Sequence, residues 1–74
     1  MFDDLQIVAL TRDLPEQGLS IGDIGTIVHV YEDGKAYEVE FPPRTGQNLR
    51  LVTLDPNALR SVGSRDVATA GAAR

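Results

Sequence analysis

The sequence has no cysteine and no tryptophan, and it has a single histidine, His29, among its 74 residues. Without cysteine the chain has neither disulfide bonds nor thiolate ligands for a metal ion. One histidine without cysteine also leaves no His/Cys metal cluster and no nucleophile–histidine arrangement for covalent catalysis. We therefore expect no cofactor, no metal ion and no enzyme activity.

Long apolar runs are also absent. No stretch approaches the roughly 18 apolar residues of a membrane-spanning helix, so we expect no membrane partner. The first four residues end in two aspartates, whereas a secretory signal begins with basic residues. The apolar run at residues 6–10 is also too short for such a signal. These features predict a cytoplasmic protein.

Positive charge is scarce. Seven Lys and Arg residues against eleven Asp and Glu residues give a net charge of -4 at pH 7. An acidic balance repels phosphate backbones and disfavours a general nucleic-acid binder. At this length the chain forms one small domain with a thin core and no deep substrate cavity.

The apolar residues that are present occur in short groups separated by Gly, Pro and Asp. No stretch keeps helical spacing for three turns, so the pattern predicts several short strands. The expected strands are residues 5–10, 24–31, 36–41, 48–54 and 59–62.

The third expected strand has the clearest pattern. Apolar and acidic residues alternate in residues 36–41, which predicts a buried face with Tyr37 and an outer face with Glu38 and Glu40. The dipeptide Asp-Gly at residues 33–34 predicts a tight hairpin before this strand.

A long loop is expected at residues 11–23. Its apolar side chains predict that it folds back onto the core; they are Leu14, Leu19 and Ile21. Glycines in and after the loop favour turns with positive φ; they are Gly18, Gly22 and Gly25.

Asp55 followed by Pro56 predicts an N-cap and one helical or 3₁₀ turn before the last strand. This order of elements predicts an all-β fold, a small five-stranded SH3-like barrel spanning residues 1–62. Residues 63–74 have almost nothing to bury and are expected to form a flexible C-terminal tail.

Three sequence blocks occur in a fixed order: Asp-Leu-Pro at residues 13–15, Gly-Asp-Ile-Gly-Thr at 22–26 and Glu-Val-Glu-Phe at 38–41. Over residues 5–62 the chain resembles the bacterial family known as Domain of Unknown Function 4926. The resemblance implies a stand-alone small β-barrel and a bacterial source, and it implies no activity, cofactor or catalytic residue.

The first functional hypothesis is a non-catalytic protein-interaction module. An acidic barrel without a reactive group suits an antitoxin-like or accessory partner of a basic protein. The candidate partner-binding residues are Asp13, Glu16, Glu38 and Glu40. A solvated outer strand face accounts equally for the last two.

The alternative is a nucleic-acid or ribosome-associated module. Residues 22–27 are similar to KOW-type segments of ribosomal and transcription-elongation proteins, a likeness that indicates the fold but not the function. The candidate nucleic-acid contacts are Arg44 and Arg50. His29 alternates with apolar neighbours and is expected to point outward.

Overall fold

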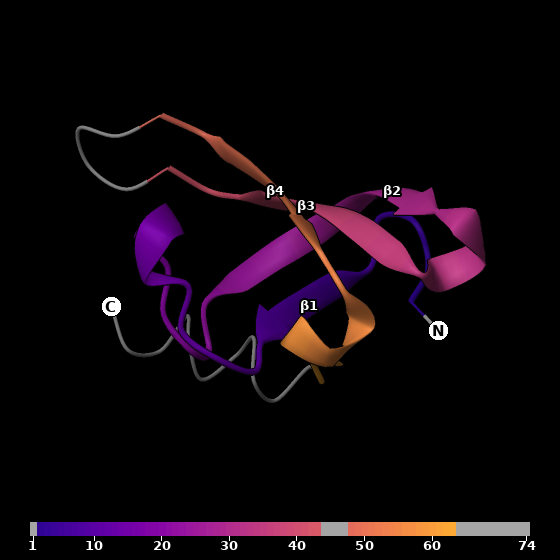
Figure 1. Ribbon diagram of the computed structural model, residues 1–74, viewed down its shortest axis with the longest axis horizontal. Coiled ribbons are helices and arrows are strands. Elements are labelled where there is room, and N and C mark those ends of the chain that lie inside the picture. The colour runs from indigo at the N-terminus through magenta and orange to yellow at the C-terminus, as the bar shows by residue number, and fades with distance from the viewer. Residues whose placement is uncertain (1, 44–47, 64–74) are drawn as a thin grey trace.

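The computed structural model describes residues 2–43 and 48–63 and contains only strands and 3₁₀ turns (Figure 1). The strands are β1 (Ile7–Leu10), β2 (Ile24–Tyr31), β3 (Ala36–Phe41), β4 (Arg50–Leu54) and β5 (Leu59–Ser61). The 3₁₀ turns are η1 (Pro15–Gln17), η2 (Glu32–Gly34) and η3 (Pro56–Ala58). The predicted all-β fold with a turn before the last strand is confirmed, and η1 and η2 are additional.

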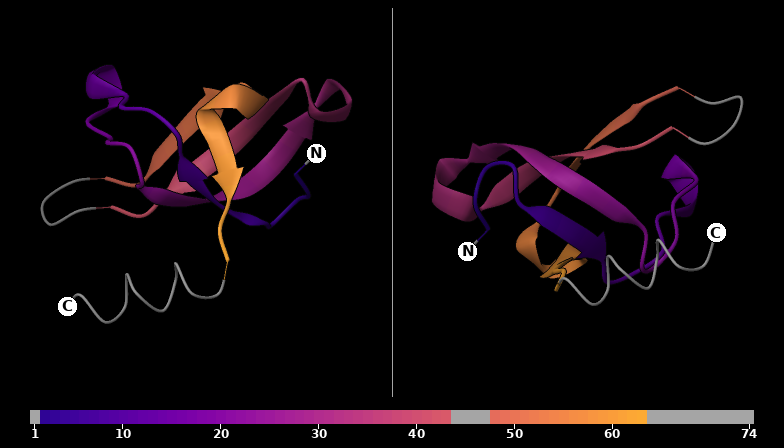
Figure 2. Two further views of the ribbon diagram at one scale, coloured as in Figure 1. Left: turned by 90° about the horizontal axis from the view of Figure 1, so that it is seen from below. Right: turned by 180° about the vertical axis from the view of Figure 1, so that it is seen from behind.

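The strands form one curved antiparallel sheet in the order β4-β3-β2-β1-β5 (Figure 2). The two end strands, β4 and β5, are not hydrogen-bonded to each other in the described residues. The predicted barrel is therefore not closed by hydrogen bonds, and β4 remains an edge strand.

The core lies on one face of this sheet. Tyr37, Val39 and Phe41 are each at most 1% exposed, whereas Glu38 and Glu40 between them are only half-buried. The alternation predicted for β3 is confirmed. Each such apolar side chain stabilises the fold by about 1.5–3 kcal/mol relative to an exposed position. The rest of the core cluster consists of Val8, Leu10, Leu19, Ile27, Val52, Leu54, Ala58 and Leu59.

A change of register interrupts the β2–β3 ladder. Ile27 pairs with Val39 and His29 with Glu38, so β2 has one extra residue between these pairs. Such a bulge bends the strand and shifts which residues face outward. His29 is exposed, as predicted.

The hairpin predicted at Asp33 and Gly34 is confirmed. Both residues have positive φ, 57° and 99°, and Glu32 before them also does, at 45°. The connection is longer than a two-residue turn because Tyr31 and Ala36 form the last pair of the ladder.

The turn prediction is correct for two of the three glycines. Gly18 and Gly22 have φ of 69° and 88°, but Gly25 lies inside β2 without a positive φ. Its small size is needed for packing, because a Cβ there would lie 2.7 Å from Cγ1 of Val39. The turn assignment for Gly25 was therefore wrong.

The fold-back of the long loop is largely confirmed. Leu19 is 7% exposed and Leu14 packs against the core. Ile21 departs from the prediction and is 63% exposed, because it lies in the turn that the hydrogen bond from the N–H of Asp23 to the carbonyl of Ser20 closes.

Residues 64–74, which include nearly all of the expected tail, lie outside the described residues. Within the described ranges, no helix has the length and apolar character needed to cross a membrane.

Candidate functional site

The loop between β1 and β2 forms a small hairpin of its own. The N–H of Leu14 donates to the carbonyl of Leu19 at 2.9 Å, and the N–H of Leu19 donates to the carbonyl of Leu14 at 3.1 Å. η1 lies between these two residues, and Gly18 ends it in the left-handed conformation that glycine adopts easily. The hairpin gives the loop a fixed shape.

Side-chain acceptors hold the base of this loop. Asp13 accepts a hydrogen bond from the N–H of Ile21 at 2.8 Å, and Asp23 accepts one from the N–H of Ser20 at 2.9 Å. The predicted partner-binding residue Asp13 therefore also has a structural role. One of its carboxylate oxygens orders the loop.

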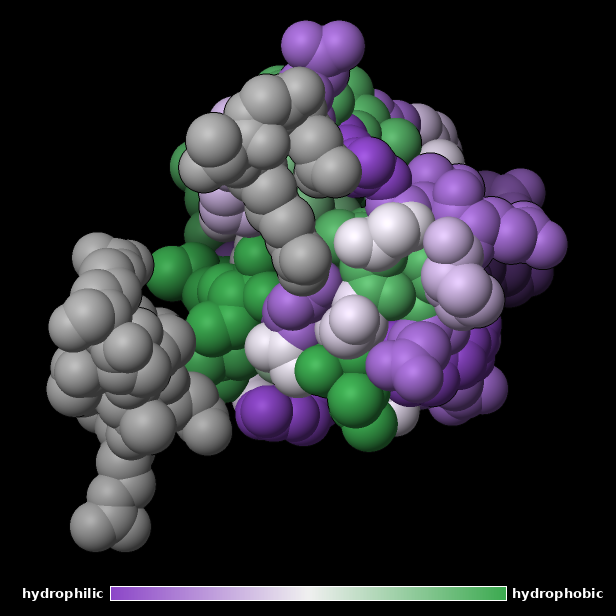
Figure 3. Space-filling view, turned by 90° about the vertical axis from the view of Figure 1, so that its left-hand side faces the viewer, coloured by the Kyte–Doolittle hydropathy of each residue, from purple (hydrophilic) through white to green (hydrophobic). Residues whose placement is uncertain are grey.

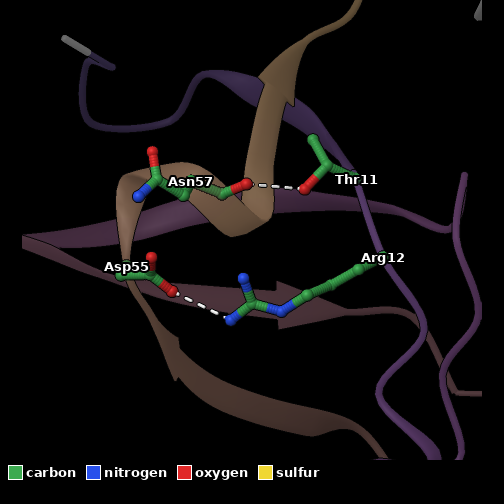
Figure 4. A network of polar contacts seen from close by, with 4 residues as sticks. All are labelled: Thr11, Arg12, Asp55 and Asn57. Atoms are coloured by element: carbon green, nitrogen blue, oxygen red, sulfur yellow. Dashed lines mark hydrogen bonds and ion pairs between the residues drawn. The ribbon is translucent and has the colours of Figure 1, made fainter.

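Two polar contacts join the start of the loop to the segment that follows β4 (Figure 4). The guanidinium of Arg12 lies 3.0 Å from the carboxylate of Asp55, and the hydroxyl of Thr11 donates to the carbonyl of Asn57 at 2.6 Å. Asp55 precedes η3 as predicted, but its side chain makes no capping hydrogen bond. The predicted N-cap position of Asp55 is confirmed, and its carboxylate pairs with Arg12 rather than with a backbone N–H of η3.

A groove lies between this loop and β4. It encloses about 240 Å³ and is lined by residues 13–17 and 52–54. Val52 and Leu54, each under 10% exposed, give it an apolar floor, and the exposed Glu16 stands on its loop side. We call this cavity the η1–β4 groove.

Arg50 reaches the loop from the beginning of β4. Its guanidinium lies so close to Gly18 that a Cβ there would stand 3.1 Å from a guanidinium nitrogen. Arg50 thus approaches the loop just before the groove residues of β4, which are residues 52–54. The Arg12–Asp55 ion pair joins the loop to the residue just after them. Arg44, the other predicted nucleic-acid contact, lies outside the described residues.

A second cavity, of about 210 Å³, lies between the later part of the loop and the end of β3. Its lining residues are Leu19, Asp23, Ile24, Phe41, Pro42 and Pro43. Figure 3 views the end of the molecule where η1 and the far end of β3 lie, and it shows hydrophobic surface there beside strongly hydrophilic surface.

The other two predicted carboxylates are on the opposite face of the sheet. Glu38 accepts a hydrogen bond from the hydroxyl of Tyr31 at 2.5 Å. The rings of Tyr31 and His29 pack edge to face, with their centroids 4.4 Å apart. The hydrogen bond to Glu38 raises the pKa of Tyr31 above its ordinary value. Glu40 pairs across the strands with Thr26 and Leu51.

The structure therefore divides the four predicted carboxylates into two pairs. Asp13 and Glu16 line the η1–β4 groove, whereas Glu38 and Glu40 face away from it. The sequence analysis missed Val52 and Leu54 as groove residues. Their alternation in residues 50–54 indicates a buried face, but it does not reveal that the loop meets this face.

The described residues thus define a small all-β protein with a preformed groove of apolar floor and acidic wall, and no three of their His, Asp or Glu side chains cluster as metal ligands would. The family model for a domain of unknown function, DUF4926, matches residues 4–61. The chain therefore belongs to the DUF4926 family. No match was found among curated proteins or among solved structures.

Proposed function

We propose that this protein is a non-catalytic interaction module that binds a basic segment of a partner protein in the η1–β4 groove. The proposal rests on one observation: the loop that forms the acidic wall is fixed in place against an apolar floor. A preformed site loses little conformational freedom when it binds, which favours affinity.

The size of the groove supports a side chain as its occupant. About 240 Å³ is less than the roughly 300–1,000 Å³ of typical small-molecule and cofactor sites. A groove of this size suits an apolar side chain of a partner better than a substrate and its catalytic groups.

Electrostatics supports a basic partner. Glu16 makes no hydrogen bond or ion pair with the residues that the structure describes, so its carboxylate is available to a cation. The net charge of -4 attracts such a partner over a longer range and speeds their encounter. An antitoxin-like or accessory role beside a basic protein is the form of this function that we favour.

The outer face is a weaker candidate. The carboxylate of Glu38 already accepts a hydrogen bond from Tyr31, and neither the η1–β4 groove nor the second cavity is lined by Glu38 or Glu40. Binding there would compete with an existing contact and offer no apolar pocket.

A matched pair of charge reversals tests the proposal. The full chain, Glu16→Arg and Glu40→Arg are each immobilised and used to capture partners from the native host. We expect the wild type and Glu40→Arg to retain the same partner, and Glu16→Arg to lose it by at least about tenfold. Thermal unfolding of all three controls for folding. Loss on Glu40→Arg with retention on Glu16→Arg would place the site on the outer face instead.

The nucleic-acid alternative is tested with the full chain and with Arg50→Ala. Fluorescence anisotropy with single- and double-stranded RNA at low salt would show affinity that falls steeply as salt rises if Arg50 contacts phosphates. We expect no such binding at high micromolar protein. Salt-sensitive binding that is abolished by Arg50→Ala would favour the alternative over the protein-binding role.

A further inference from the structure

β4 has an open backbone edge beside the groove. It is the end strand of the sheet and pairs only with β3. In the described residues, no backbone hydrogen bond joins β4 to any segment other than β3. In an antiparallel ladder, alternate residues of an edge strand direct their N–H and C=O groups away from the neighbouring strand. These groups of β4 remain available.

The groove runs along this same edge. Its lining residues are three consecutive residues of β4, Val52, Thr53 and Leu54, and the loop residues 13–17, and none of them belongs to β3. The groove therefore borders β4 on the side away from β3, which is the open edge.

The other sheet edge is a poorer template. β5 has three residues, Leu59–Ser61, against the five of β4. Neither the η1–β4 groove nor the second cavity is lined by a residue of β5. A long edge with an adjoining pocket is the arrangement in which added strands obtain both affinity and specificity.

We infer that the partner segment binds as an extended strand that adds to the open edge of β4. This inference rests on the proposed function and specifies its geometry. Main-chain hydrogen bonds to β4 supply affinity, an apolar side chain enters the groove over Val52 and Leu54, and a Lys or Arg side chain pairs with Glu16. The apolar and the cationic residue therefore stand two positions apart in the segment, because alternate side chains of a strand point to the same face.

Charge favours a basic segment over a second copy of this chain. Two copies each carry a net charge of -4, and pairing of their β4 edges would bring two acidic loops toward one interface. Like charges at an interface oppose association, whereas a cationic strand neutralises Glu16 and Asp13.

The test uses short acetylated peptides in which Val or Leu stands two positions from Lys or Arg, titrated into the isotope-labelled full chain. Matched peptides carry N-methyl groups on alternate amides, either on the odd or on the even positions. Methylation removes the donors that face β4 in only one of the two sets. We expect one set to bind at least about tenfold more weakly and the other to bind like the parent. Hydrogen exchange of alternate β4 amides should slow on binding of the parent peptide.

The remaining outcomes separate this inference from the proposed function. In one outcome, peptide binding shifts the amide signals of residues 13–17 and 52–54 without slowing hydrogen exchange in β4; in another, the two methylated sets bind equally. Either result would overturn strand addition but leave the groove as a docking site. No shifts in the groove with any peptide, together with partner capture unaffected by Glu16→Arg, would overturn both. Hydrogen exchange of the β4 amides is also measured without peptide at several protein concentrations. Exchange that slows as the concentration rises would identify a second copy as the occupant and overturn the inference.

Discussion

The backbone of Gly25 lies directly against the side chain of Val39. A Cβ at position 25 would stand 2.7 Å from Cγ1 of Val39 and 2.9 Å from the carbonyl oxygen of Glu40. Real Cβ atoms do not approach backbone oxygens so closely, so any larger residue must displace β3. The close contact of β2 with β3 therefore depends on this glycine.

Gly25→Ala is expected to destabilise the protein by about 1–3 kcal/mol through overpacking, and Gly25→Val by more. Thermal unfolding should show a lower Tm by at least about 4 °C. The double variant with Val39→Ala is the control, since it removes the nearest clashing atom. The two losses should then be less than additive. Full additivity would show that the contact with Val39 is not the cause.

The ion pair of Arg12 with Asp55 is expected to contribute little to stability. Both side chains are about half exposed, 52% and 47%, and such pairs contribute about 0.2–1 kcal/mol. A double-mutant cycle with Arg12→Ala and Asp55→Ala should give a coupling in this range that decreases at high salt. A larger coupling that salt does not change would mean that the pair acts as a buried clamp on the loop.

The Tyr31–Glu38 hydrogen bond predicts a pH effect above neutrality. The folded-state pKa of Tyr31 is raised, first by the hydrogen bond to Glu38, so the folded protein holds this proton more tightly than the unfolded chain. Its stabilising effect is fully present below the ordinary tyrosine pKa of about 10 and is lost as pH rises through the folded-state value.

Glu38→Ala should therefore lower the pKa of Tyr31 toward its ordinary value. The measurement is a pH titration of the Tyr31 ring carbons by NMR, in the wild type and in Glu38→Ala. An unchanged Tyr31 titration in the variant would show that the hydrogen bond does not form in solution.

Removal of residues 64–74 is expected to leave the fold intact. Among the residues that the structure describes, the core cluster begins at Val8 and ends at Leu59. The shortened chain should unfold within about 0.5 kcal/mol of the full chain, the usual range for changes outside the core. A marked loss of stability would contradict the predicted boundary between the domain and its tail.

Local patterns in the sequence predicted the strands well. The alternation around Val39 and the Asp-Gly pair at residue 33 depend on short-range geometry, and both predictions are confirmed. The prediction failed where a distant residue determines the outcome, since Gly25 is small because of Val39 and not because of a turn. The N-cap position of Asp55 was predicted, but the pairing of its carboxylate with Arg12 was not.

The groove shows the same limit. Asp13 and Glu16 were predicted as partner-binding residues from their position in an acidic loop. Their neighbours Val52 and Leu54 come from a strand more than thirty residues away, and only the fold of the loop against β4 brings them together. Charge could be found in the sequence, but the apolar floor required the tertiary structure.

The most direct test of the central claim is an amide chemical-shift map of the labelled full chain with its captured partner. The account predicts that the largest shifts fall at residues 13–17 and 52–54, on the two sides of the η1–β4 groove. Largest shifts at Thr26, Glu38 and Glu40, with the groove unperturbed, would contradict it and assign binding to the outer face of the sheet.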